Sequence, residues 1–122
     1  MATSEVNLHP EVDAWYLDLD HDTANRVEQA IDMLAAEGPG LGRPLVDHVK
    51  ASRHHNMKEL RATTSVRILF AFDPRREAIL LVAGDKRGQW DRWYKTSVPV
   101  ADDRYDEWLD ATNRGGRMPS TP

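Results

Sequence analysis

The chain has 122 residues, of which 40% are hydrophobic, no cysteine and a net charge of −4 at pH 7. These values indicate one small domain with a modest core, and they exclude disulfides, thiolate chemistry and cysteine-built zinc sites. No apolar run reaches the roughly 18 residues that a membrane span needs and the N-terminus lacks the pattern of a signal peptide, so we expect a cytoplasmic protein with a single domain over residues 1–114.

The first forty residues predict a short strand and two helices. Residues 5–8 alternate apolar and polar side chains, as a strand does. Pro10 suits the first turn of a helix, whose apolar stripe consists of Val12, Trp15, Tyr16 and Leu19. A second helix has Asp22 or Thr23 as its N-cap and ends at the Gly-Pro-Gly of residues 38–40. Its apolar stripe consists of Ala24, Val27, Ile31 and Leu34. The two helices are therefore expected to form a hairpin that covers one face of a sheet.

Residues 57–72 predict the centre of that sheet. A connector and a polar loop lead to two strands, residues 57–61 and 66–72, which are joined by a polar turn. Arg61 and Arg67 lie among apolar neighbours in these strands, and the second strand is apolar on both faces. Two interpretations of Arg67 stay open. It forms an ion pair with a carboxylate on the next element, or it lines a concave site for an anion, which suits the planar guanidinium.

The last third predicts one more strand and a helix. Residues 73–76 form a turn around a proline, and residues 79–83 form an apolar strand. A polar loop and a segment of aromatic and charged residues lead to a helix that begins after Pro99, and residues 115–122 predict a disordered tail. The order β-α-α-β-β-β-α indicates an α+β fold, with the helical hairpin and a C-terminal helix on a mainly antiparallel sheet of about four strands.

Charge is distributed unevenly along the chain. Residues 1–42 contain nine acidic residues and one basic residue, whereas residues 43–100 contain twelve basic and six acidic residues. Residues 101–122 contain five acidic and three basic residues. The sheet-forming half is therefore cationic, which indicates an anionic partner for that side or simply charges on a solvated surface.

The motifs resemble those of the RelE/ParE superfamily of bacterial toxins, and most of all its HigB-like branch of phage-derived Gp49-type proteins. The resemblance is carried by GRPLV at 42–46, MKELR at 57–61, VRILFAFD at 66–73, AILLVAGDKRG at 78–88, and residues 90–99. It implies a RelE-like fold and the toxin of a type II toxin–antitoxin system, which cleaves mRNA on the ribosome. It also implies a cognate antitoxin with an Xre-type helix-turn-helix domain. The usual run of lysines after the last strand is shortened here, and the overall charge is acidic.

The resemblance also implies which residues form the site. Arg61 and Arg67 match the two strand arginines that hold the scissile phosphate, and Lys86 matches the lysine after the last strand. Tyr94 is a candidate for proton transfer or base stacking, and His54 for a general base, because its ordinary pKa is near 6.5. The RNA-binding candidates are Lys58, Arg87, Trp90 and Lys95. Lys58 alternates with Arg61, which turns it to the other face of a regular strand.

Several of these residues have a second interpretation. Trp93 suits a core anchor for the final helix, and Trp90 suits either a base-stacking group or packing. His48, His54 and His55 match no metal-binding signature, and they also suit a solvated loop; no metal or cofactor is expected. The same fold also occurs in gyrase-directed ParE-like toxins, so a gyrase inhibitor or a non-catalytic interaction module is the alternative function.

Overall fold

The structure is a computed structural model that describes residues 3–115. In chain order its elements are β1 (Val6–Leu8), α1 (Pro10–Leu17), α2 (His21–Glu37), the 3-10 turn η1 (Gly38–Gly40), β2 (Val46–His48), β3 (Lys58–Arg61), β4 (Val66–Phe72), β5 (Ala78–Asp85) and α3 (Trp90–Gly115). The predicted tail lies outside the described residues, apart from Gly115 at the end of α3. None of the described helices is both long enough and apolar enough to cross a membrane.

The strands form one sheet in the order β1-β5-β4-β3-β2. β1 is parallel to β5, and the other neighbouring pairs are antiparallel. The predicted α+β fold with a helical hairpin and a C-terminal helix is confirmed. The sheet has five strands rather than about four, because Val46–His48, which the sequence analysis placed in a connector and a polar loop, pairs with β3.

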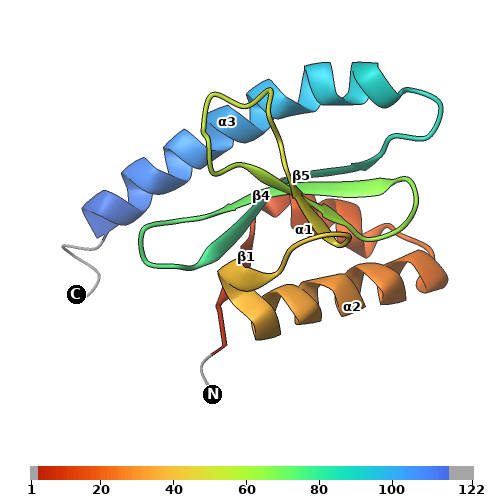
Figure 1. Cartoon of the computed structure of the whole chain (residues 1–122), viewed down its shortest axis with the longest axis horizontal. Helices are drawn as coiled ribbons and strands as arrows, with labels where there is room; N and C mark the ends of the chain where they lie inside the picture. The colour runs from red at the N-terminus through yellow and green to blue at the C-terminus, as the bar shows by residue number, and fades with distance from the viewer. Residues whose placement is uncertain (1–2, 116–122) are drawn as a thin grey trace.

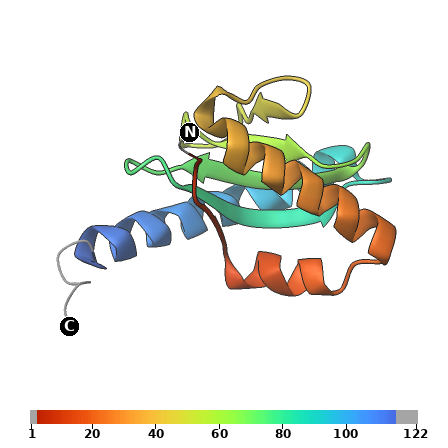
Figure 2. The same cartoon turned by 90° about the horizontal axis from the view of Figure 1, so that it is seen from below.

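The helices cover the sheet from two sides. Figure 1 shows α3 on one side and α2 on the other, and in Figure 2 the chain runs along α1 and returns along α2. The core under α1 and α2 includes Val12, Val27, Leu34, Leu60, Ile68 and Phe70. The core under α3 includes Met57, Leu69, Ala71, Leu81, Ala101 and Tyr105. Because side chains alternate along β4, Arg67 shares the α3 face with Leu69.

The predicted hairpin is correct except at its corner. α2 begins at His21, and its N-cap is Asp20, whose carboxylate accepts a hydrogen bond from Thr23 N at 3.0 Å. Asp22 and Thr23 therefore lie in the first turn, and the prediction that one of them is the cap was wrong. The helix ends as predicted, at a Gly38 whose φ of 62° suits glycine. Trp15, Tyr16 and Ile31, expected in the core, are partly buried and pack against it.

The last helix begins ten residues earlier than the sequence indicated, at Trp90, and Pro99 lies inside it. Residues at helical spacing face the sheet along its length: Trp93, Ser97, Val98, Ala101 and Tyr105. Burial of this stripe offsets the hydrogen bond that the proline cannot donate. Asp102, predicted near the helix start, is instead in its middle. There it accepts hydrogen bonds from the Ser52 hydroxyl and from Arg53 N, the latter at 3.1 Å, which ties the β2–β3 loop to α3.

Candidate anion-binding site

Two arginines lie side by side on neighbouring strands. Arg61 of β3 and Arg67 of β4 are register partners across the hairpin, so both project toward α3. Arg67 is buried, and its Nη1 donates hydrogen bonds to the carbonyls of Thr63 at 2.7 Å and Val66 at 3.1 Å. Like charges that face each other across a sheet destabilise it. The pair therefore needs a counter-charge nearby.

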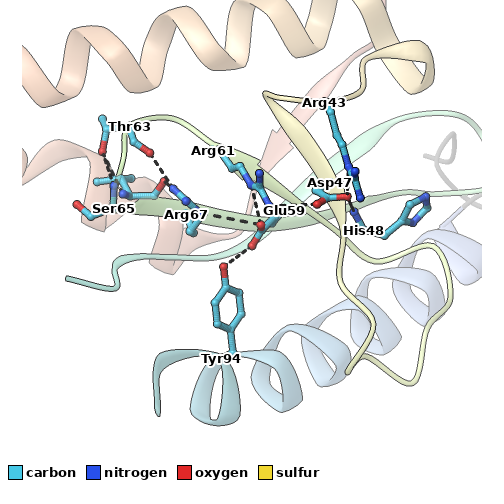
Figure 3. Close-up of polar contacts among 10 residues, drawn as sticks. Arg43, Asp47, His48, Glu59, Arg61, Thr63, Ser65, Arg67 and Tyr94 are labelled. Atoms are coloured by element: carbon cyan, nitrogen blue, oxygen red, sulfur yellow. Dashed lines mark hydrogen bonds and ion pairs between the residues drawn. The ribbon is translucent and has the colours of Figure 1, made fainter. Parts of the chain in front are cut away.

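Glu59 supplies that counter-charge. It lies two residues before Arg61 on the same face of β3, and it is only 5% exposed. Its Oε2 accepts a hydrogen bond from Arg61 Nε at 2.9 Å and lies 4.0 Å from Arg67 Nε. Its Oε1 accepts a 2.6 Å hydrogen bond from the Tyr94 hydroxyl of α3, as Figure 3 shows. Arg67 therefore lies near a carboxylate, but Glu59 is on the preceding strand and not on the next element, and the contact is not a hydrogen bond.

Glu59 is the residue that the sequence analysis did not single out. One local signal was available, because a glutamate two positions before an arginine in a strand lies on the same face as that arginine. That spacing does not show that Tyr94, 35 residues later, contacts the same carboxylate. The packing of α3 over the sheet makes that contact.

Tyr94 and Lys86 complete the cluster. Burial and the hydrogen bond to Glu59 raise the pKa of Tyr94 to about 12, so the phenol is protonated at neutral pH. The Lys86 side chain is buried, and its ammonium lies 3.3 Å from the centroid of the Trp90 ring. Burial first, and then the positive charge of Arg67, lower the pKa of Lys86 below its ordinary value. The ammonium is therefore a readier proton donor than that of an exposed lysine.

A chain of ion pairs continues from the cluster to the edge of the sheet. Arg61 Nη2 donates to Asp47 Oδ2 at 3.1 Å, and Arg43 Nε donates to Asp47 Oδ1 at 3.1 Å. Asp47 of β2 is thus shared between two arginines. Arg61, Arg67 and Lys86 consequently face Glu59 and part of one further carboxylate, which leaves the cluster with excess positive charge. The arrangement suits an anion, since guanidinium groups bind phosphate oxygens in pairs.

Trp93 supports the cluster from α3 through a close contact with the sheet. A Cβ added to Gly84, the register partner of Arg67, would lie 2.5 Å from Trp93 Nε1. Such a distance is not tolerated without movement. Trp93 packs against the core under α3, as its interpretation as a core anchor predicted.

Gly84→Ala is therefore expected to push Trp93 away from the sheet and to lower the free energy of unfolding by about 1–3 kcal/mol, the usual cost of overpacking. Denaturant unfolding followed by tryptophan fluorescence measures both effects. The matched control is Gly42→Ala, because a Cβ there meets nothing within 4 Å. Equal stabilities of the two variants would contradict this account of Gly84.

Some predicted site residues lie elsewhere. The ring of His54 packs on Tyr105, and its Nε2 lies 2.8 Å from Asp106 Oδ1. Asp106 is twelve residues, or about 18 Å, along α3 from Tyr94. The structure does not bring His54 to the cluster, because its loop is held at the middle of α3. Lys58 points to the opposite face, with Nζ 5.8 Å from the Phe72 ring centroid. Within residues 3–115, no three potential ligands are grouped to hold a metal ion.

The remaining RNA-binding candidates lie near the start of α3, close in the chain to Lys86 and Tyr94. Trp90 is 55% exposed, with one ring face over Lys86. Arg87 is exposed and pairs with Asp85 at 3.1 Å. Lys95 is exposed one residue beyond Tyr94. These three side chains thus lie next to the cluster in the chain and are accessible to a ligand.

Comparisons with known proteins identify the family. The family described as "Phage derived protein Gp49-like" matches residues 14–106. This chain belongs to the Gp49-like family. The Gp49-like chain is 55% identical over 112 residues to "Putative toxin HigB3" of Mycobacterium tuberculosis, covering 91% of this chain and 98% of HigB3. It is 51% identical over 102 residues to "Putative toxin HigB2" of the same organism, covering 80% of this chain and 51% of HigB2.

A solved structure gives the same fold. The Gp49-like chain resembles the crystal structure of the archaeal RelE–RelB complex from Pyrococcus horikoshii OT3, with a TM-score of 0.58. The match covers 71% of this chain and 98% of the archaeal chain, at 18% identity. The RelE-like fold and the HigB-like, Gp49-type resemblance are therefore confirmed.

Proposed function

We propose that this Gp49-like protein is the toxin of a type II toxin–antitoxin system that acts in the cytoplasm by cleaving mRNA on the ribosome. The names of its relatives support a toxin, and the RelE-like fold is compatible with one. The observation that carries the proposal is the convergence of Arg61, Arg67 and Lys86 around Tyr94 and Glu59 on one face of the sheet. This is the set of groups that metal-independent RNA cleavage requires.

In the proposed reaction the 2′-oxygen of the substrate attacks the neighbouring phosphorus. Arg61 and Arg67 hold the non-bridging oxygens, where negative charge grows in the transition state. The 2′-hydroxyl proton passes to Glu59, the P–O5′ bond breaks, and the leaving 5′-oxygen takes a proton from the Lys86 ammonium. The products are a 2′,3′-cyclic phosphate and a 5′-hydroxyl.

The surrounding side chains are proposed to hold the RNA. The exposed face of Trp90 stacks on an unpaired base, a contact of about 1–3 kcal/mol. The hydroxyl of Tyr94 donates a hydrogen bond to the phosphate, and Arg87 and Lys95 attract the backbone. His54 and Lys58 have no role in this proposal, because the structure places them away from the cluster.

Induction of the chain alone in bacteria tests the proposal. The 5′ ends of cellular mRNA are mapped with translation running and with translation blocked. We expect new 5′-hydroxyl ends within coding regions only when ribosomes are translating. Growth arrest without new ends, together with loss of DNA supercoiling activity, would instead identify a gyrase inhibitor. Normal growth would favour a non-catalytic interaction module.

The partner that we propose is an antitoxin with an Xre-type helix-turn-helix domain, which neutralises the toxin by covering the cationic sheet half, residues 43–100. Arg87→Glu combined with Lys95→Glu is expected to slow antitoxin association about tenfold at low ionic strength, since complementary charges steer encounter. Asp18→Lys with Asp32→Lys, both exposed on the helical hairpin side, is the matched control. Stopped-flow or surface-based association rates measure the difference. A larger effect of the hairpin changes would place the antitoxin on α1 and α2.

A further inference from the structure

Glu59 occupies the space between the two arginines at which an anionic ligand is expected to bind. We infer that its carboxylate is an internal substitute for the substrate phosphate, which holds the arginines in place in the free chain and gives way when an anion binds. The identification of that anion as an RNA phosphate rests on the proposed function. The exchange itself requires only an anion of phosphate chemistry.

The hydrogen-bond donors around Glu59 are the first reason. One carboxylate oxygen accepts a hydrogen bond from Arg61 Nε at 2.9 Å, and the other accepts one from the Tyr94 hydroxyl at 2.6 Å. Two guanidinium groups and a hydroxyl that converge on one anion form a set that binds phosphate as readily as carboxylate. Glu59 is 5% exposed, so in the free chain solvent has little access to this carboxylate.

The incomplete satisfaction of Arg67 is the second reason. Among the described residues, Arg67 Nε is the one buried side-chain polar atom without a hydrogen-bond partner, and it lies 4.0 Å from Glu59 Oε2. Buried donors are nearly always satisfied, and an unsatisfied one costs about 1–3 kcal/mol. A phosphate has more oxygens than a carboxylate and can reach both Nε groups at once.

The charge of Lys86 is the third reason. None of the ion pairs among residues 3–115 includes Lys86, although its side chain is buried beside Trp90. Glu59 pairs with two of the three cations of the cluster, Arg61 and Arg67, and the charge of Lys86 is left without an ion pair among the described residues. A bound phosphate would add the negative charge that the cluster lacks, and the displaced carboxylate would lie next to the 2′-hydroxyl whose proton it takes.

The exchange has a consequence for regulation of the site. Because every anion must compete with a carboxylate that is covalently part of the chain, free phosphate and stray RNA bind weakly. A substrate that the ribosome positions binds through many contacts at once, so it can displace Glu59 where a free anion cannot. The site is thereby held closed until the ribosome presents mRNA.

Glu59→Gln tests the exchange directly. Glutamine keeps the shape and removes the competing charge. Its single amide oxygen can accept the hydrogen bond of Arg61 Nε, and its NH2 group can donate to the oxygen of the Tyr94 hydroxyl. We expect inorganic phosphate and a 2′-deoxy oligonucleotide, which cannot be cleaved, to bind Glu59→Gln at least tenfold more tightly than the native chain, by calorimetry without ribosomes. Asp102→Asn is the matched control, because it removes another buried carboxylate that accepts hydrogen bonds from the β2–β3 loop. Equal or weaker binding by Glu59→Gln would overturn the inference and leave Glu59 as a structural brace.

A measurement on the native chain covers the case in which Glu59→Gln does not fold. In an NMR titration with phosphate, the Nε–H signals of Arg61 and Arg67 are expected to shift, because their anion changes. The signal of Arg75, which pairs with Asp73 and Glu77 away from the cluster, should not move. Unchanged Arg61 and Arg67 signals at saturating phosphate would contradict the exchange. Both assays are independent of mRNA cleavage, so failure of the nuclease proposal would not be mistaken for failure of this one.

Discussion

Arg67→Lys is expected to lower mRNA cleavage, and with it growth arrest, by about 100-fold or more, the usual effect of removing one preorganised donor to a transition-state anion. Lysine keeps the positive charge but lacks the planar fork. It therefore cannot hold the carbonyls of Thr63 and Val66 and also present Nε to an anion beside Arg61. The rate of new 5′-end formation in a translation extract with the purified variant measures the loss.

The control for this prediction is Arg75→Lys. Arg75 also pairs with carboxylates, Asp73 at 3.4 Å and Glu77 at 3.3 Å, but all three residues lie in the β4–β5 turn. The Arg75→Lys protein should cleave mRNA at the rate of the native chain. Thermal unfolding of both variants separates a catalytic effect from a structural one, since Arg67 also neutralises part of Glu59. If the Arg67→Lys protein is folded and arrests growth as strongly as the native chain, Arg67 has no role in cleavage.

Leu34→Ala is expected to lower the free energy of unfolding by about 2–5 kcal/mol, the range for large-to-small changes at buried leucines. Leu34 is fully buried where α2 packs on the sheet. The substitution leaves a cavity between the helical hairpin and the strands that carry the arginines. Because a domain of this size is stable by only about 5–15 kcal/mol, this loss is a large share of its stability.

Chemical denaturation followed by circular dichroism measures that change. The matched control is Leu17→Ala, because Leu17 is 73% exposed at the end of α1 and its loss should change stability by less than about 0.5 kcal/mol. If Leu34→Ala lowers the free energy of unfolding by less than about 1 kcal/mol, the residues around position 34 must move to fill the cavity. That result would contradict the close packing expected of protein interiors.

Local sequence patterns determined most of the fold and half of the site. The β3–β4 hairpin was predictable because period-2 alternation and a polar turn depend only on neighbouring residues. For the same reason Arg61 and Arg67 could be placed in neighbouring strands from the sequence. The end of α2 at Gly38 was also predictable, since a helix stop is a property of a few consecutive residues.

The tertiary structure alone decided the rest. α3 continues through Pro99 because its apolar stripe is buried against β4 and β5. The expectation that proline begins a helix rests on the local sequence, which does not show that burial. His54 does not join the arginines although it is only seven residues before Arg61 in the chain. Asp102 and Asp106 hold its loop at the middle of α3. The contact of Tyr94 with Glu59 joins residues 35 apart, and it exists because the helix packs across that face of the sheet. Such a contact depends on the arrangement of whole elements, which no short stretch of sequence specifies.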